Sequence, residues 1–257
     1  MPEKLKVALV QTSLHWENPE ANRTMLSHKI ETIQGKADLI VLPEMFTTGF
    51  TMSPQNIDAS EGSKTISWMQ DLAKKSKVAV VGSLAFQENN KNYNRLIFVH
   101  PDGQVNKYDK KHTFTFAGED KVYTAGTERL VIDFMGFRIC PLICYDLRFP
   151  VWARNTEAYD VLIYVANWPT PRIAAWDALL KARAIENMSY CIGVNRIGVD
   201  DLGYEYSGHS AVYDVLGNTM AFSQKEETLY VELEREHITT YRNKLKFLED
   251  QDDFSLK

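Results

Sequence analysis

One stretch of the sequence, residues 136–150, most constrains what this chain can fold into. Residues 137–143 form an apolar run of strand length that stops at Cys144, and the charged residues 145–148 then suit a turn or the start of a helix. At such a turn a side chain is lifted clear of the sheet, and the positive end of a following helix favours a thiolate. This geometry suits a nucleophile, although a lone free cysteine is more often a small buried hydrophobic residue.

Apolar runs alternate with helical patterns along the rest of the chain. We expect helices at about residues 19–35, 63–76 and 174–187, and strands at 5–11, 38–42, 78–82, 93–99, 137–143, 161–166, 190–194, 208–213 and 227–233. This mixture predicts an α/β fold with helices on one or both faces of a sheet. No internal repeat or linker divides the chain, so we expect one domain over residues 1–257, with a C-terminal tail from about 234 to 257.

The net charge and the cysteine content argue against several classes of protein function. The formal net charge is −5 without a basic stripe, which argues against a nucleic-acid partner and favours small-molecule chemistry. The N-terminus has no signal-peptide pattern and no segment has the length of a membrane span, so we expect a cytoplasmic protein that does not bind membranes. Three cysteines, an odd number without further ligands at zinc spacing, argue against a disulfide framework and a metal site.

Charged residues at two other places are candidates for a site. Glu44 directly follows the strand expected at 38–42, and ligands of open α/β sheets gather at the carboxyl ends of strands. Residues 107–128 are expected to form a long irregular loop that contains Lys110 and Glu119, and such loops are more often functional than idle. The alternatives are a solvated acidic residue at Glu44, an exposed basic patch around Lys110 and an acidic turn at Glu119.

Three motifs together resemble the nitrilase superfamily of carbon–nitrogen hydrolases. They are Leu42-Pro43-Glu44, Tyr108-Asp109-Lys110-Lys111-His112, and Ile143-Cys144-Tyr145-Asp146-Leu147-Arg148-Phe149-Pro150. The resemblance implies a four-layer α-β-β-α sandwich, a catalytic triad of Glu44, Lys110 and Cys144, an assisting glutamate at Glu119, and no metal or organic cofactor. It also implies a homodimer formed through the helices beside the cysteine turn and the C-terminal region.

Two further segments, residues 149–155 and Asn167-Trp168-Pro169, look most like the bacterial ω-amidase branch of this superfamily. That branch hydrolyses the terminal amide of 2-oxoglutaramate and 2-oxosuccinamate. Where many relatives carry arginine before the lysine, this chain has Asp109, which matches the ω-amidase branch, and Thr113 replaces a common leucine. Neither departure touches the triad.

The substrate would be a small-molecule amide, and several residues are candidates to bind it. Arg172 could hold a carboxylate through a bidentate fork, although a solvated loop charge is the alternative. The backbone N–H of Tyr145 would help Lys110 to stabilise the oxyanion. Possible pocket walls are Phe46, Phe50, Phe116 and Trp168, although each could equally belong to the core. Asp146 and Arg148 are expected to pair with each other or with neighbours and so to hold the turn.

Three readings compete with an ω-amidase. The first keeps the fold and triad but changes the substrate, as in an N-carbamoyl amino acid hydrolase or a deaminated-glutathione amidase. A true nitrilase is disfavoured because the chain is short for that branch. The third reading is a catalytically inactive binding or scaffold protein of the same fold, against which the presence of all three triad residues argues.

Overall fold

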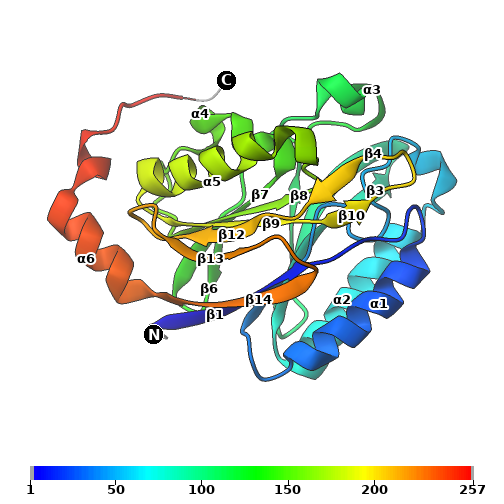
Figure 1. Cartoon of the computed structure of the whole chain (residues 1–257), viewed down its shortest axis with the longest axis horizontal. Coiled ribbons are helices and arrows are strands. Elements are labelled where there is room, and N and C mark those ends of the chain that lie inside the picture. Colours follow the sequence, from blue (N-terminus) through cyan, green and yellow to red (C-terminus); the bar gives the residue numbers. More distant parts are fainter. Residues whose placement is uncertain (1–2, 256–257) are drawn as a thin grey trace.

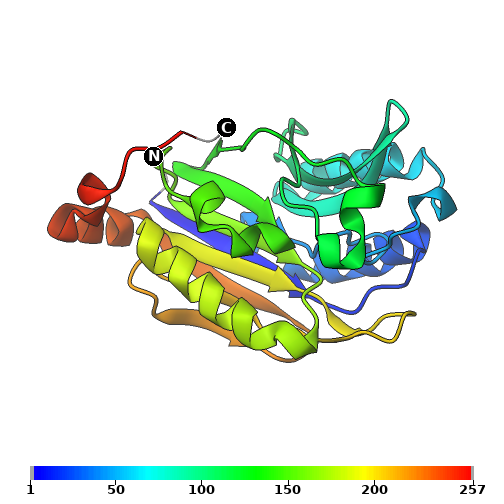
Figure 2. The same cartoon turned by 90° about the horizontal axis from the view of Figure 1, so that it is seen from above.

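The computed structural model describes residues 3–255, and two six-stranded sheets packed face to face form its centre (Figures 1 and 2). The first sheet has the order β14-β1-β2-β3-β4-β5, and the second has the order β13-β12-β9-β8-β7-β6. Helices α1 (Pro19–Ile33) and α2 (Glu61–Ser76) pack on the outer face of the first sheet, and α5 (Ile173–Asn187) packs on the second. The predicted four-layer α-β-β-α sandwich is therefore confirmed.

The first sheet consists of β1 (Lys4–Gln11), β2 (Leu39–Val41), β3 (Ala79–Glu88), β4 (Lys91–Val99), β5 (Val105–Asp109) and β14 (Glu227–Glu234). The second consists of β6 (Ile132–Phe134), β7 (Phe137–Ile143), β8 (Val161–Ala166), β9 (Tyr190–Asn195), β12 (Ser210–Tyr213) and β13 (Thr219–Ser223). A separate two-stranded hairpin is formed by β10 (Ile197–Val199) and β11 (Glu205–Ser207). The remaining α-helices are α3 (Glu119–Val122), α4 (Pro150–Ala153) and α6 (Arg235–Leu245).

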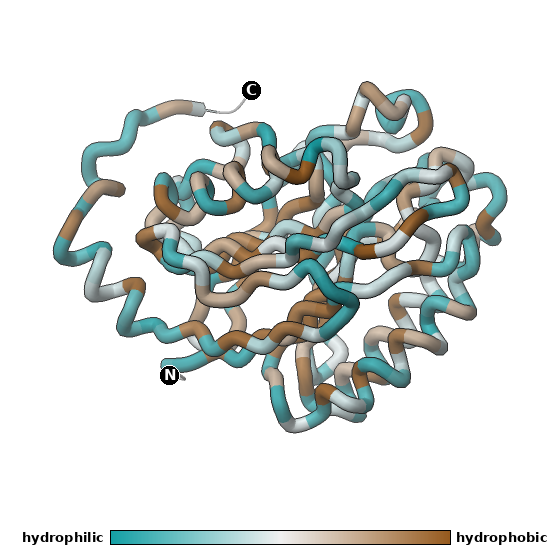
Figure 3. The backbone as a smooth tube through the Cα atoms, viewed as in Figure 1, coloured by the Kyte–Doolittle hydropathy of each residue, from teal (hydrophilic) through white to brown (hydrophobic). Residues whose placement is uncertain are grey.

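The inner strands are apolar without alternation because both of their faces are covered. In β1, Val7 and Leu9 belong to the core between the two sheets, whereas Ala8 and Val10 belong to the core under α1 and α2. A strand that is buried on both sides reads as a continuous hydrophobic run. Figure 3 shows such hydrophobic stretches in the strands, whereas the helices alternate between hydrophobic and hydrophilic residues.

Parallel pairing aligns the ends of strands that carry candidate residues. Strands β1, β2 and β3 run parallel to one another, as do β7, β8 and β9. Glu44 follows the carboxyl end of β2, and Cys144 and Asn167 follow those of β7 and β8. The carboxyl ends of parallel strands meet at one edge of a sheet, so each sheet brings its candidates to one edge.

Most predicted elements are present, and α1 begins as expected, since the Asn18 side chain accepts a hydrogen bond of 3.1 Å from Ala21 N. The prediction of an irregular loop at 107–128 is partly wrong, because this region begins on β5 and contains a 3₁₀ turn (Thr115–Ala117) and α3. Strands β6, β10, β11 and β13 were not expected; β6 and β10 have only three residues each, too few to show a period.

Among residues 3–255, no helix combines the length and apolar character that crossing a bilayer requires.

The segment after Cys144 was expected to be a turn or the start of a helix, and it is short. It is a five-residue 3₁₀ helix, Cys144–Arg148, followed by the four-residue α4. Such a short helix contributes little to the macrodipole, which sums over aligned peptide units. Any activation of Cys144 must therefore come mainly from side chains near it.

Candidate active site

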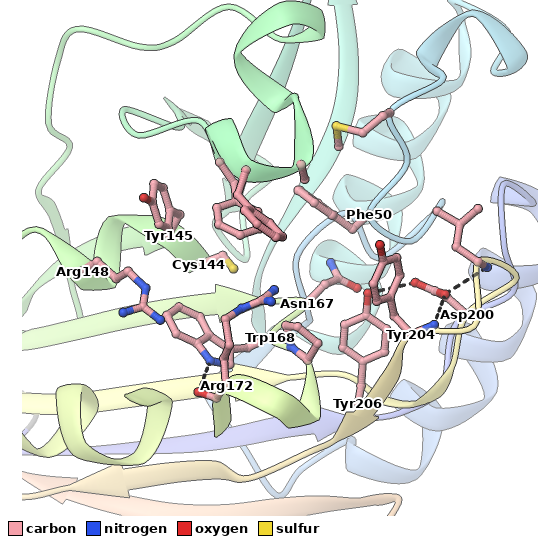
Figure 4. Close-up of a pocket in the computed structure, with 16 residues that line it drawn as sticks. Phe50, Cys144, Tyr145, Arg148, Asn167, Trp168, Arg172, Asp200, Tyr204 and Tyr206 are labelled. Atoms are coloured by element: carbon pink, nitrogen blue, oxygen red, sulfur yellow. Dashed lines mark hydrogen bonds between the residues drawn. The ribbon is translucent and has the colours of Figure 1, made fainter. Parts of the chain in front are cut away.

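Cys144 lies at the end of β7 and contributes to the lining of a cavity of about 310 Å³ (Figure 4). Its φ angle is 42°, in the left-handed region that costs a residue with a Cβ atom about 1 kcal/mol or more. The strained turn lifts the half-buried side chain out of the sheet and toward the cavity. Cys140 and Cys191, in contrast, are buried in the core.

Behind Cys144, Lys110 and two glutamates form a buried cluster of charges. Lys110 Nζ lies 2.9 Å from Glu44 Oε1 and 2.9 Å from Glu119 Oε2, and all three side chains are at most 1% exposed. The alternatives of a solvated Glu44, an exposed patch at Lys110 and an acidic surface turn at Glu119 are therefore wrong. One cation between two carboxylates offsets part of the cost of burying the three charges.

Two asparagines that the sequence analysis missed complete this cluster. Asn94 Nδ2 donates to Glu44 Oε1 at 2.8 Å and to Glu119 Oε1 at 3.1 Å, and Asn167 N donates to Glu44 Oε2 at 2.8 Å. Asn94 is buried on β4 but stands among the polar residues Lys91, Asn92 and Arg95, so no local pattern distinguished it. Asn167 belongs to a motif used only to choose the family branch.

The electrostatics of the cluster hold Lys110 charged and Cys144 neutral at rest. Burial alone would lower the pKa of Lys110, but the charges of Glu119 and Glu44 outweigh it and raise that pKa. Burial and the Glu44 charge raise the pKa of the Cys144 thiol well above its usual value, and Lys110 opposes this only in part. The sequence-based expectation of a favoured thiolate is therefore wrong for the resting site, and the thiol needs a base.

The two carboxylates of the cluster influence each other as well. Burial and the neighbouring Glu44 raise the pKa of Glu119, while Lys110 and a hydrogen bond from Phe114 N lower it. Phe114 N donates to Glu119 Oε2 at 2.6 Å. Glu44 and Lys110 therefore act in opposite directions on the proton affinity of Glu119.

The five residues expected to bind substrate all line the cavity: Phe50, Phe116, Tyr145, Trp168 and Arg172. Phe116 is 85% exposed, so it stands at the mouth. The Arg172 guanidinium lies 5.2 Å from the centre of the Phe114 ring, and no carboxylate among residues 3–255 forms an ion pair with it. Phe46, in contrast, is fully buried in the core under α1 and α2, so its suggested role as a wall is wrong.

The other side of the cavity comes from the β10–β11 hairpin, which the sequence analysis did not consider. Asp200, Leu202, Tyr204 and Tyr206 line it, opposite Arg172 in Figure 4. Asp200 is buried, and its carboxylate accepts hydrogen bonds from Leu202 N, Tyr204 N and Tyr206 Oη at 2.9–3.0 Å. The negative charge of this aspartate is thus engaged within the hairpin.

Of the two expected arrangements of Asp146 and Arg148, pairing with each other does not occur, whereas Asp146 does pair with neighbouring residues. Asp146 is completely buried and accepts hydrogen bonds from Tyr108, His112 and Ile143. Arg148 is exposed and lies 5.0 Å from the centre of the Trp168 ring. Side chains two residues apart on a 3₁₀ helix, which has three residues per turn, point in different directions, and this separates the two charges.

A thiol on a strained turn beside a buried lysine and a buried carboxylate suits the attack of a nucleophile on an amide. The protein is a hydrolase that acts on amide carbon–nitrogen bonds. The chain belongs to the carbon–nitrogen hydrolase family, whose model matches residues 6–243.

Relatives and solved structures agree with this assignment. The chain is 42% identical to omega-amidase YafV of Yersinia enterocolitica, with 98% of each chain covered. It is 35% identical to the 2-oxoglutaramate amidase of Bacillus subtilis strain 168, with 87% of this chain and 88% of that one covered. A carbon–nitrogen hydrolase superfamily protein of Xanthomonas campestris, solved with an arsenic adduct in its active site, is 37% identical with a TM-score of 0.96 and 99% of both chains covered. Nit3 of Saccharomyces cerevisiae, from branch 10 of the nitrilase superfamily, is 28% identical with a TM-score of 0.84, over 95% of this chain and 94% of that one.

Proposed function

We propose that the protein is an ω-amidase, which cleaves the terminal amide of a small 2-oxo acid amide such as 2-oxoglutaramate or 2-oxosuccinamate to the dicarboxylic acid and ammonia. The observation that carries the proposal is the cavity at Cys144, which has a buried Lys110–Glu44–Glu119 cluster behind it. Its wall contains Arg172, which forms no ion pair within residues 3–255. The names of the relatives in Yersinia enterocolitica and Bacillus subtilis support the choice of substrate.

In the first half of the reaction, Cys144 Sγ bonds to the amide carbonyl carbon while Glu44 takes the thiol proton. The raised pKa of the thiol makes this base necessary. Lys110 and the backbone N–H of Tyr145 stabilise the tetrahedral oxyanion. When the carbon–nitrogen bond breaks, Glu44 returns the proton to the leaving nitrogen, so ammonia departs and a thioester remains.

In the second half, water attacks the thioester carbon, and Glu44 again accepts a proton. Glu119 assists by holding Lys110 beside Glu44, since both of its carboxylate oxygens accept hydrogen bonds from Lys110 Nζ, at 3.1 and 2.9 Å. The carbon–sulfur bond then breaks, the sulfur regains its proton, and the dicarboxylic acid is released. Each proton taken by Glu44 is returned within the cycle, so the enzyme ends unchanged.

Arg172 is the residue that we assign to the carboxylate of the substrate. A guanidinium can hold a carboxylate through two parallel hydrogen bonds, and that of Arg172 has no acidic partner among the described residues. Phe50, Phe116 and Trp168 would enclose the apolar carbons, and the engaged carboxylate of Asp200 would not compete for Arg172.

The test is ammonia release from 2-oxoglutaramate by the wild type and by Cys144→Ala, run beside glutamine, an N-carbamoyl amino acid and a simple nitrile. We expect turnover of the 2-oxo amide that disappears in the variant. Turnover of the carbamoyl compound alone, seen as ammonia together with carbon dioxide, would instead indicate an N-carbamoyl amino acid hydrolase. Deaminated glutathione is assayed as a further substrate by release of its dipeptide amine, since its hydrolysis frees no ammonia. Turnover of that compound alone would indicate a deaminated-glutathione amidase, and no turnover of any substrate would favour the scaffold reading.

We further propose that residues 1–257 form one domain. We also propose that the protein is cytoplasmic and forms a homodimer. Three free thiols suit a reducing compartment. Val151 on α4 and Ile185 on α5 are apolar and 55% and 46% exposed, which suits an interface on the helices beside the cysteine turn. Sedimentation of the protein as a monomer at micromolar concentration would contradict the dimer.

A further inference from the structure

Asp146 receives an unusual number of hydrogen bonds for a single side chain. Its Oδ2 accepts from Tyr108 Oη at 2.7 Å and from Ile143 N at 3.0 Å. Its Oδ1 accepts from His112 N at 3.0 Å and lies 2.8 Å from His112 Nδ1. The side chain is completely buried, so these protein groups take the place of water around the carboxylate.

The partners of Asp146 belong to the two chain segments that carry the lysine and the cysteine. Tyr108 and His112 stand two residues before and two residues after Lys110, and Ile143 directly precedes Cys144. The first segment leaves β5 in one sheet, and the second leaves β7 in the other. One carboxylate therefore binds both sheets at the point where the candidate catalytic side chains meet.

Aromatic packing supports the same junction. The His112 ring stacks on that of Phe149, with centroids 3.8 Å apart and planes 7° apart, and Trp152 Nε1 donates to Tyr108 Oη at 3.1 Å. Phe149 and Trp152 follow Cys144 in the chain, whereas His112 and Tyr108 flank Lys110. The contact between the two segments is thus packed as well as hydrogen-bonded.

We propose that Asp146 is a positioning residue, which sets the distance between Lys110 and Cys144 by binding the segments that carry them. This inference rests on the proposed roles of those two residues. The φ angle of 42° at Cys144 is a strained conformation that surrounding contacts must maintain, and the bond from Ile143 N to Asp146 is one such contact. A displacement of about 1 Å in a catalytic geometry can slow turnover ~10²-fold.

The test compares Asp146→Asn with a matched control, Asp160→Asn. In Asp146→Asn one oxygen becomes an NH₂ group, which faces the backbone N–H of either Ile143 or His112. Asp160 is also a buried aspartate that accepts from a backbone N–H of β7, Arg138 N at 3.0 Å, and it lies at the opposite end of that strand. Both variants weaken a buried acceptor of a backbone N–H of β7, but only one does so at the site. Asp160 also forms ion pairs with Arg235 and Arg242, so its replacement should cost stability as well.

We expect Asp146→Asn to lower kcat by about 10²-fold with little change in KM, and to move the pH midpoint of Cys144 alkylation by iodoacetamide upward by about one unit as Lys110 moves away. In Asp160→Asn both quantities should match the wild type, even if the protein unfolds more readily. Equal kcat and alkylation profiles in the two folded variants would overturn the proposal.

If Asp146→Asn does not fold, Tyr108→Phe provides the test, because it removes one donor to Asp146 and keeps the ring. A several-fold lower kcat and a smaller upward shift of the alkylation midpoint are expected, and wild-type values of both would overturn the proposal. The alkylation measurement needs no amide substrate. If the wild type does not hydrolyse 2-oxoglutaramate, the proposed function fails, but the alkylation profiles still decide the role of Asp146.

Discussion

Lys110 is the residue on which the charge balance of the site depends. It is the only cation hydrogen-bonded to Glu44 and Glu119 among the described residues, and it donates to both. The same ammonium lies close enough to Cys144 to oppose part of the rise in the pKa of its thiol. One side chain therefore both neutralises the buried carboxylates and remains available to an oxyanion.

Replacing Lys110 with alanine should slow amide hydrolysis by ~10²–10³-fold, because the oxyanion loses a charged donor. It should also destabilise the fold by about 3–5 kcal/mol, because two buried carboxylates lose their counter-charge. Steady-state ammonia release and urea unfolding measure the two effects. Lys111→Ala is the control, since Lys111 lies over the Trp152 ring, 5.3 Å from its centre, and outside the cluster; equal losses in both variants would contradict the role of Lys110.

Arg172→Ala should raise KM for 2-oxoglutaramate, because hydrogen bonds to a charged group contribute about 1.5–3 kcal/mol, or roughly 10- to 100-fold in kcat/KM. Arg172→Lys should restore only part of this, since an ammonium lacks the planar fork. A simple aliphatic amide without a carboxylate is the control substrate. An equal loss on both substrates would mean that Arg172 supports the pocket rather than binding the carboxylate.

At the scale of elements, two segments of little regular structure form the walls of the cavity. One carries Phe114 and Phe116 and ends at α3, and the other is the β10–β11 hairpin. The hairpin turn is stabilised by Asp200, whose Oδ1 accepts from Leu202 N and Tyr204 N. The strands thus place the reacting groups, whereas the loops determine the shape of the space in front of them.

Asp200→Ala should therefore raise KM several-fold while kcat changes little, because the hairpin loses three hydrogen bonds, one of them from Tyr206 Oη. The chain offers a close control in Asp214→Ala. Asp214 Oδ1 accepts from Leu216 N and Asn218 N, both at 2.9 Å, at the β12–β13 turn away from the cavity. Steady-state kinetics of both variants would reject a role for the hairpin if KM rose equally in the two.

At the scale of the whole molecule, the close packing of the two sheets makes the free energy of unfolding fall as the pH rises through the alkaline range. Burial raises the pKa of Cys140 to about 12, whereas the thiol ionises at about 8.5 in an unfolded chain. Above about pH 9 the unfolded state releases this proton and the folded state keeps it. Stability is then complete below that pH and falls as the pH rises toward 12.

We expect the free energy of unfolding to fall by up to about 1.4 kcal/mol per pH unit for this thiol between about pH 9 and 11. Cys140→Ala should be less stable at neutral pH because of the cavity it leaves, but its alkaline slope should be shallower by up to that amount. Urea unfolding at several pH values measures both. Identical slopes would show that Cys140 does not contribute.

How much the sequence could predict differs between the fold and the site. Unbroken apolar runs such as residues 161–166 identified the inner strands, because burial on both faces removes polar residues. The Asn18-Pro19 start of α1 was predictable for a local reason as well, since a capping side chain bonds within its own first turn. Short elements such as β10 and β11 were not predicted, because a strand of three residues is too short to show a hydrophobic period.

By itself, the sequence determined the layered α/β architecture and the family, because strand periodicity and short motifs are properties of neighbouring residues. Only the tertiary structure decided which distant residues meet. Asn94 binds Glu44 across 50 positions of the chain, and Asp146 binds Tyr108 and His112 rather than the nearby Arg148. Burial and opposing charge also decided that the Cys144 thiol is neutral at rest, which no local pattern encodes, because a pKa depends on every charge and every lost water around the group.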